Sequence, residues 1–229
     1  HILLNRRRAR IFGSSSSSLM AYQYINDCDV WHTCPIDYLW IYDKLILAIK
    51  NGYVAGPAGI PVPKAGYYII RPITNIRMMS KGASKKWLTP NDTHLVPDGF
   101  FWQEYFKGDH ISVDYYKGKE HLVVQGFRDD NDQLDRFYKW EKLPLGNNPF
   151  PKVLGNLFEL TEWVNVEYIG NKIIEVHLRW NDDFRNHNGS TIYPVWSDRE
   201  FDSSKILNFD KCYWYPSLCQ KRLGFWVLD

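Results

Sequence analysis

Apolar and polar residues alternate on both sides of one Gly-Asn pair in the second half of the chain. The stretch 163–181 reads WVNVEYIGNKIIEVHLRWN, with every second residue apolar before the pair at 170–171 and again after it. A period of two around a Gly/Asn turn is typical of a β-hairpin. The pattern therefore predicts two antiparallel strands with one apolar and one polar face.

The polar face of this predicted hairpin carries candidate metal chemistry. A three-residue loop at 170–172 would place Glu167 opposite Glu175 and Asn165 opposite His177, whereas a two-residue loop would separate the acids. Carboxylates directly across an antiparallel pair repel each other unless positive charge lies between them. Magnesium is commonly held by one or two carboxylates and nucleotide phosphates. The alternative is an ordinary solvent-facing polar face, which the pattern alone favours.

The rest of the pattern predicts an α+β chain. Apolar residues at helical spacing predict a helix from Asp37 to Asn51, N-capped by Asp37, and a second helix over 153–162. Alternating or bounded apolar runs predict strands over 66–72, from 100, over 111–116, 121–127 and 137–142, and at 224–228. A loop is predicted over 74–88, and a polar surface loop over 181–188, where Asn181 and Asp183 are possible further ligands.

Composition and charge narrow the class of protein. The 229 residues are 45% hydrophobic, which is ample for a core, and the formal net charge is +2. Four arginines lie in residues 1–19; beyond them, 24 basic residues face 26 acidic ones, so a nucleic-acid partner is not indicated. We interpret residues 1–19 as a tail added for expression before a natural start at Met20, with an organellar transit peptide as the alternative. The absence of a long apolar run predicts no membrane span, and we expect a cytoplasmic protein.

Four motifs in order resemble the ATP-grasp ligases. The family's Asp-Lys and Gly-x-Pro-x-Pro opening is similar to DK and GYVAGPAGIPVP at 43–63, and its Val-Lys-Pro strand end is similar to GYYIIRP at 66–72. Its hinge strand and Ser-Val-Asp motif are similar to FFWQEYFKGDHISVD at 100–114, and its closing motif is similar to VNVE and IIEVHLR between 164 and 179. By itself, the Asp-Lys pair predicts only a solvated helix face.

The resemblance implies a metal and phosphate site. Glu167, Glu175 and His177 take the positions that hold the Mg²⁺ ions bound to ATP; because His177 stands where the family has Asn, Mn²⁺ is also possible. Arg71 takes the position of the phosphate-binding lysine. Catalytic roles fall to Arg71, Arg179 and Lys81, which lies in the predicted 74–88 loop.

The resemblance also implies a nucleotide site at the hinge. Glu104, Tyr105 and Phe106 would lie along adenine, with Gln103 beside them. Asp109 or His110, just past the glycine, would bind ribose; His110 stands where the family has Glu. The implied fold is α+β, with two small lobes whose antiparallel sheets clasp the nucleotide. These lobes would span 20–185 and divide near 104–108, with an aromatic-rich extension at 186–229 packed on them.

The implied activity is ATP-dependent ligation, in which a small-molecule carboxylate becomes an acylphosphate that an amine or thiol captures. Since the usual preceding domain of the family has no counterpart here, we expect the extension, a partner chain or another protomer to complete the substrate site. Two alternatives remain open at this point. One is a catalytically degenerate ATP-grasp fold that binds or has a structural role, and the weaker one is nucleic-acid association through the lysines at 81–86.

Overall fold

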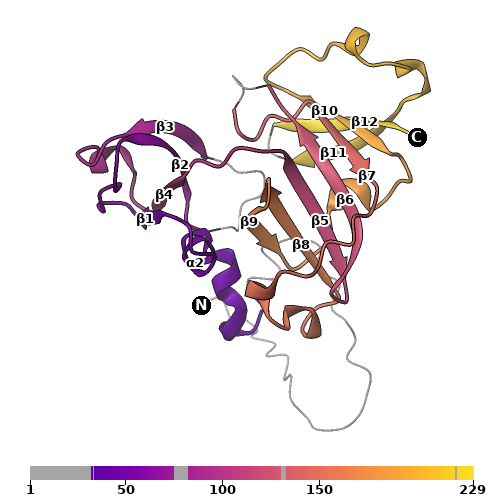
Figure 1. Ribbon diagram of the computed structural model, residues 1–229. Helices are drawn as coiled ribbons and strands as arrows, with labels where there is room; N and C mark the ends of the chain where they lie inside the picture. Colours follow the sequence, from indigo (N-terminus) through magenta and orange to yellow (C-terminus); the bar gives the residue numbers. More distant parts are fainter. Residues whose placement is uncertain (1–31, 33, 75–81, 130–132, 220) are drawn as a thin grey trace, which may run out of the picture.

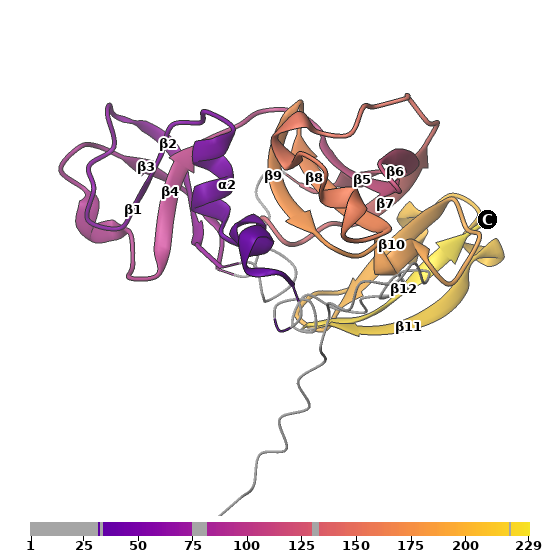
Figure 2. The same cartoon turned by 90° about the horizontal axis from the view of Figure 1, so that it is seen from below.

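The computed structural model describes residues 32, 34–74, 82–129, 133–219 and 221–229. Two antiparallel sheets lie side by side, with the short helix α2 (Lys44–Lys50) between them (Figure 1 and Figure 2). The predicted α+β class, with antiparallel sheets and few helices, is confirmed. Residues 1–19 and Lys81 lie outside the described residues, as do residues 75–80 of the predicted 74–88 loop. None of the described helices is long and apolar enough to cross a membrane.

The smaller sheet has the strand order β1-β4-β2-β3. Its strands are β1 (Ala55–Pro57), β2 (Gly66–Pro72), β3 (Ser84–Leu88) and β4 (Phe100–Glu104). The prediction of a strand over 66–72 is confirmed. The prediction of a loop over 74–88 is wrong at its end, because 84–88 pairs with β2 from Gly66 onwards. Tyr68, Ile70 and Trp102 form the core of this sheet.

The larger sheet has the order β11-β12-β10-β7-β6-β5-β8-β9, with each strand antiparallel to its neighbours. Its strands are β5 (His110–Tyr116), β6 (Lys119–Phe127), β7 (Lys139–Leu143), β8 (Trp163–Ile169), β9 (Lys172–His177), β10 (Thr191–Trp196), β11 (Tyr213–Cys219) and β12 (Arg222–Leu228). The aromatic-rich C-terminal part therefore extends the sheet through backbone pairing, rather than packing on it as a separate layer.

The predicted first helix is divided into two. A 3₁₀ helix, η1 (Ile36–Tyr42), is followed by α2, and Asp43 between them has an extended backbone. The N-cap is therefore Asp43 and not Asp37: its side chain accepts a hydrogen bond from the Ile46 amide at 2.8 Å. The predicted end of the helix is confirmed, with Asn51 as C-cap.

The predicted helix over 153–162 is wrong. Two 3₁₀ turns, η3 (Lys152–Leu154) and η4 (Leu157–Glu159), occupy the segment instead. Gly155 between them has φ +55° and ψ −131°, which no α-helix accommodates. The remaining 3₁₀ turns are η2 (Thr93–Leu95), η5 (Asp182–Phe184), η6 (Ser203–Lys205) and η7 (Phe209–Lys211).

The two faces of the larger sheet bury different groups. On one face, Val166 and Val176 pack with Tyr42 and Leu47 of the helical segment and with Leu157 of η4. This is the apolar face that the alternation predicts. The opposite face carries the polar residues of β5, β8 and β9, and further along the sheet it carries a second apolar cluster of Val124, Phe184, Ile192, Phe225 and Val227.

The hairpin of β8 and β9 has Glu167 opposite Glu175 because β9 contains a bulge. Its turn has two residues, 170–171, which is the shorter of the two loops considered from the sequence, and the strands pair directly from the turn outwards. A bulge at Ile174 then adds one residue to β9, so that Glu167 again lies opposite Glu175. A two-residue turn without this bulge would place the two acids on different faces.

Candidate active site

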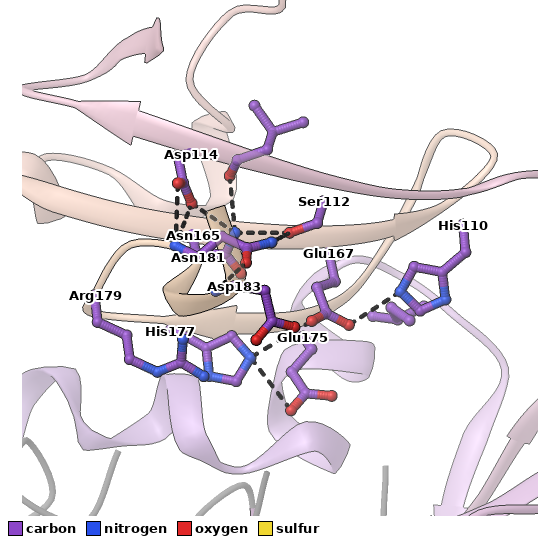
Figure 3. Close-up of polar contacts among 12 residues, drawn as sticks. His110, Ser112, Asp114, Asn165, Glu167, Glu175, His177, Arg179, Asn181 and Asp183 are labelled. Atoms are coloured by element: carbon purple, nitrogen blue, oxygen red, sulfur yellow. Dashed lines mark hydrogen bonds and ion pairs between the residues drawn. The ribbon is translucent and has the colours of Figure 1, made fainter. Parts of the chain in front are cut away.

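Three neighbouring strands place polar side chains on one face of the larger sheet. In register, β5 contributes His110, Ser112 and Asp114, while β8 contributes Asn165 and Glu167. On β9, Glu175 and His177 lie opposite Glu167 and Asn165, as the three-residue-loop hypothesis required. Figure 3 shows these side chains gathered over the sheet, including both predicted acids. Because side chains two residues apart share a face, period-two alternation aligns the polar residues within each strand, and the bulge at Ile174 brings those of β9 to the same face.

Glu167 lies between two histidines (Figure 3). Its Oε2 is 3.1 Å from Nε2 of His110, and its Oε1 is 3.8 Å from Nε2 of His177. Burial alone would raise the pKa of Glu167, but hydrogen bonds and positive charge from the two histidines hold that pKa well below its usual range. Glu167 is therefore an ionised carboxylate, and its side chain is 22% exposed, so it can reach a ligand.

Glu175 is compensated by a lysine that sequence reasoning assigned to a solvated helix face. Its Oε2 is 3.0 Å from Nζ of Lys44, with side-chain exposures of 3% and 4%, and its Oε1 is 3.4 Å from Nε2 of His177. That assignment was wrong because the N-terminus of α2 packs against β9. The Asp-Lys pair thus has two structural roles: Asp43 caps α2, and Lys44 neutralises an acid of the site.

The donors suit a metal that is also bound by phosphate. Among the described residues, no group of three or more His, Cys, Asp or Glu side chains is placed to hold an ion by itself. Glu167 and Glu175 nevertheless present carboxylate oxygens from opposed strand positions, which are the hard donors that Mg²⁺ prefers. Magnesium bound with one or two carboxylates takes its remaining ligands from phosphate and water. The pair therefore fits a nucleotide-bound ion better than a metal site made only of protein groups.

A second buried carboxylate, Asp114, supports the same face. The amide of Asn181 donates to both of its oxygens at 3.0 Å, and Asn165 Nδ2 donates to Oδ1 at 2.8 Å. Burial raises the pKa of Asp114 to about 6, and these hydrogen bonds oppose that rise. The contact fixes the start of the 181–188 segment over the sheet. The prediction of a surface loop there is wrong for its first part, since Asn181 and Asp183 are half-buried and Phe184 is buried, whereas Arg185 and Asn186 are exposed.

A pocket lies between the two sheets. Arg71, Gln103, Glu104, Tyr105, Phe106 and His110 line it, and all six are residues that the resemblance assigned to nucleotide binding. Its apolar walls are Ile69 from the smaller sheet and Ile169 and Ile174 from the hairpin of the larger sheet. An apolar pocket with a few convergent polar groups is the usual form of a small-molecule site.

Arg71 connects this pocket with the acids. It is only 7% exposed, and its Nη2 donates to Gln103 Oε1 at 3.1 Å and to the Ile174 carbonyl at 2.9 Å. Its Nε has no hydrogen-bond partner in the described part of the chain. Burial lowers the pKa of Arg71, while the charges of Glu175 and Glu167 oppose this. A buried guanidinium with an unused donor is suited to bind phosphate.

Asp109 has a different environment from the other candidate residues. Its side chain is exposed and lines a neighbouring cleft together with Lys85, Lys107 and Gln125. His110, the other residue considered for ribose, is buried against Glu167. Lys85 lies over the Tyr105 ring, with Nζ 4.0 Å from the centroid, so a cation from the smaller sheet does reach the cleft.

The linker between the sheets rests on the hairpin turn. The Gly170 amide donates to the Asp109 carbonyl at 2.8 Å. Gly108 has φ +136°, and a Cβ there would lie 2.9 Å from backbone atoms of Gly170. Only glycine meets both conditions, the positive φ and the close approach. This contact sets the distance between the linker at 105–109 and the acids of β8 and β9.

A second pocket contains the two acids, Glu167 and Glu175. Its polar side is formed by Glu167, Glu175, His177 and Arg179. The remainder is lined by aromatic rings and an ion pair from segments without a motif, namely Phe137, Trp140, Phe184, Trp196, Asp183 and Arg222. Arg222 donates to Asp183 through both Nη atoms, at 2.5 and 2.7 Å. Of these residues, only Asp183 was named from the sequence, as a possible further ligand; no local pattern marks the others, and tertiary pairing brings β7, β10 and β12 to the site.

Comparisons with known proteins give partial structural likenesses. No family model matches the chain, and no curated protein sequence matches it. A protein described as belonging to the ATP-grasp superfamily, from Archaeoglobus fulgidus, is 16% identical with a TM-score of 0.43, over 82% of this chain and 64% of that one. An L-amino acid ligase from Bacillus licheniformis is 10% identical with a TM-score of 0.44, over 63% and 41% of the two chains.

A third similar structure is the D-alanine–D-alanine ligase from Bacillus anthracis. It is 14% identical with a TM-score of 0.37, over 61% of this chain and 57% of the ligase. The chain thus spans between 41% and 64% of the length of these three proteins. The chain is thus similar in structure to parts of ATP-grasp proteins and ligases.

Proposed function

We propose that this chain is an ATP-dependent ligase of the ATP-grasp type, which activates a carboxylate as an acylphosphate for capture by an amine or thiol. One observation carries the proposal. The pocket between the sheets meets the acid and histidine cluster at His110, which lines both that pocket and the one beyond. The base, the phosphates and the acceptor would therefore follow one another along a single path.

The nucleotide would lie with its base in the apolar part of the first pocket. Adenine can be recognised by backbone groups of 104–106, and Ile169 and Ile174 provide an apolar surface against the ring. The phosphates would then pass Arg71, whose guanidinium lines this pocket and is affected by the charges of Glu175 and Glu167. Lys81 is proposed as a further phosphate contact on the strength of the resemblance alone.

Glu167 and Glu175 are proposed to hold Mg²⁺, or Mn²⁺, together with the phosphates, and His177 lies against both acids. When bound, the ion would neutralise phosphate charge and fix the phosphates in place. In the chain itself, Lys44 holds Glu175 and His110 holds Glu167, so both acids are positioned before any ligand arrives. Preorganisation of this kind reduces the cost of binding.

The chemical step requires positioning more than a protein nucleophile. A carboxylate oxygen of the substrate would form a bond to the γ-phosphorus as the bond to ADP breaks, which yields an acylphosphate. The amine nitrogen or thiol sulfur would then attack the acyl carbon, losing a proton, while phosphate leaves. Arg71 and Arg179 are suited to balance the negative charge that develops on the transferred oxygens.

Thermal unfolding with ATP and Mg²⁺ or Mn²⁺ tests the nucleotide part of the proposal. Ligand at 100 times its dissociation constant adds about 2.7 kcal/mol, which for a chain of this size raises Tm by roughly 5–10 °C. We expect that rise in the wild type and its loss in Glu167→Gln. Glu159→Gln, on an exposed turn of the opposite face, is the control and should keep it.

Turnover is tested separately by ADP release with mixtures of carboxylates, amines and thiols. ADP that appears only when both a carboxylate and an acceptor are present supports the ligase. A metal-dependent Tm rise without ADP release in any mixture would instead favour a degenerate ATP-grasp fold that binds nucleotide. No Tm rise at millimolar nucleotide would contradict the proposal for this chain.

A further inference from the structure

The second pocket has an aromatic wall. The Phe137 and Trp140 ring centroids are 4.4 Å apart, and the His110 ring meets both edge-on, at 5.0 and 5.4 Å. Trp196 lies in the same pocket, and its indole N–H donates to the Phe137 carbonyl at 3.0 Å. The rings are thus held by contacts with each other and with the backbone. Such a wall offers its faces to a flat apolar group.

A glycine makes room for these rings above the sheet. Gly126 of β6 lies opposite both His110 and Trp140. A Cβ at Gly126 would come within 2.8 Å of Phe137 and of Trp140. The missing side chain lets the two rings settle directly on the sheet beside His110. The aromatic wall therefore lies next to the acid cluster, close to where the proposed reaction would take place.

The charged groups around the wall have partners within the protein. Asp183 is bound by Arg222, and Asp135 is 2.7 Å from Arg136, whose guanidinium also stacks over Trp196 at 4.6 Å. A ligand that lies against the rings therefore meets no isolated charge there. Its own charge would be met at the other end of the pocket, where Arg179 and His177 lie.

We propose that the carboxylate substrate carries an aromatic ring, which stacks against Trp140, Phe137 and Trp196 while its carboxylate faces Arg179. This inference rests on the proposed function for the role of the carboxylate, but the preference for a ring is a property of the pocket. β7 and β10 supply the two tryptophans and β12 supplies Arg222, so the C-terminal strands help to determine substrate choice.

Binding of defined probes to the full chain tests the proposal. Dissociation constants of 3-phenylpropanoate, 3-cyclohexylpropanoate and propanoate are measured by calorimetry, without nucleotide and with a non-hydrolysable ATP analogue plus Mg²⁺. We expect 3-phenylpropanoate to bind about tenfold or more tightly than propanoate, because ring stacking adds to the apolar area buried. The cyclohexyl probe should lie between them. The amine 3-phenylpropan-1-amine should bind more weakly than the carboxylate of the same length.

Variants locate the site. Trp140→Ala should bring the affinity for 3-phenylpropanoate close to that for propanoate, and the milder Trp196→Phe should weaken it by a few-fold. Trp214→Ala is the matched control: Trp214 is 39% exposed on β11, outside this pocket, and its loss should leave all affinities unchanged. Circular dichroism and the ATP-induced Tm rise show whether each variant is folded.

Several results would overturn the inference. These are equal affinity for 3-phenylpropanoate and propanoate under both conditions, unchanged affinity in folded Trp140→Ala, or tighter binding of the amine than of the carboxylate. If these occurred while ATP still raised Tm, the nucleotide site would stand and only the substrate class would be wrong. If 3-phenylpropanoate bound as expected but ATP did not, the pocket preference would stand and the ligase proposal would fail.

Discussion

At the residue scale, the buried pair of Lys44 and Glu175 decides how the two acids coexist. Its 3.0 Å contact is almost completely removed from solvent. Removing one partner of a buried ion pair leaves a desolvated charge without compensation, which costs about 3–5 kcal/mol. We therefore expect Lys44→Met to lower the free energy of unfolding by that amount in urea titrations.

Two controls give this prediction its meaning. Lys205→Met removes a lysine that is 81% exposed and pairs with Asp202, and it should cost only about 0–1 kcal/mol. The double variant Lys44→Met with Glu175→Leu should recover part of the loss, because no buried charge then remains. A loss in Lys44→Met as small as that in Lys205→Met would show that the lysine does not compensate Glu175.

Asp114 makes stability depend on pH in a predictable direction. Burial raises its pKa from 3.8 to about 6 in the folded chain, so the folded state binds its proton more tightly than the unfolded state. The protonated form of Asp114 therefore stabilises the folded state. This contribution to the free energy of unfolding is fully present below the unfolded pKa of 3.8 and is lost as the pH rises through about 6. The change from pH 4 to pH 7 is on the order of 3 kcal/mol.

The comparison with Asp114→Asn isolates this effect from other titrating groups. Glu167 acts in the opposite direction, because its lowered pKa gives stability that is lost as pH falls. Subtracting the unfolding free energies of Asp114→Asn from those of the wild type at each pH removes the contribution of Glu167. The wild type should lose stability relative to Asp114→Asn as the pH rises from 4 to 7, so this difference should fall. A difference that does not change with pH would show that Asp114 keeps an ordinary pKa.

At the scale of elements, the linker at 105–109 contacts the turn of the β8–β9 hairpin through Gly108 and Gly170. Gly108→Ala introduces a strained positive φ and a Cβ that meets the backbone of Gly170 at 2.9 Å. We expect a loss of about 1–3 kcal/mol in unfolding free energy and weaker ATP binding, since the linker lines the proposed nucleotide site. Thermal unfolding with and without ATP measures both effects.

Gly66→Ala is the matched control for Gly108→Ala. Gly66 begins β2, and a Cβ there would make only an ordinary contact at 3.7 Å. The variant should bind ATP as the wild type does, with a change in stability within about 0.5 kcal/mol. Equal behaviour of the two alanine variants would argue that the linker can move away from the turn at no cost.

At the scale of the whole molecule, the proposed nucleotide site is shared between two sheets. Its lining comes from β2 and β4 on one side and from β5, β8 and β9 on the other. Bound ATP should therefore slow amide hydrogen exchange at 104–106 and at 169–175 together. Exchange in β11, at the far edge of the larger sheet, should be unchanged, and protection of only one sheet would contradict a shared site.

The sequence by itself determined the elements whose pattern is local. Alternation predicts the β8–β9 hairpin, and the apolar run bounded by Gly and Pro predicts β2, because side-chain direction in a strand depends only on residue parity. The candidate residues from Arg71 to His110 that line the pocket could be named for a different reason: they follow motifs of contiguous residues. Their presence in one pocket was an expectation until the two sheets could be placed.

Only the tertiary structure decided how distant segments complete the site. The turn of the hairpin has two residues, and the bulge at Ile174 is what places Glu167 opposite Glu175. Packing of α2 on β9 buries Lys44, which the helical pattern by itself had assigned to a solvated face. Arg222 and Trp196 reach the second pocket through pairing of β12 with β10 and of β10 with β7. Such contacts join residues far apart in the chain, and their energies depend on burial that no local pattern encodes.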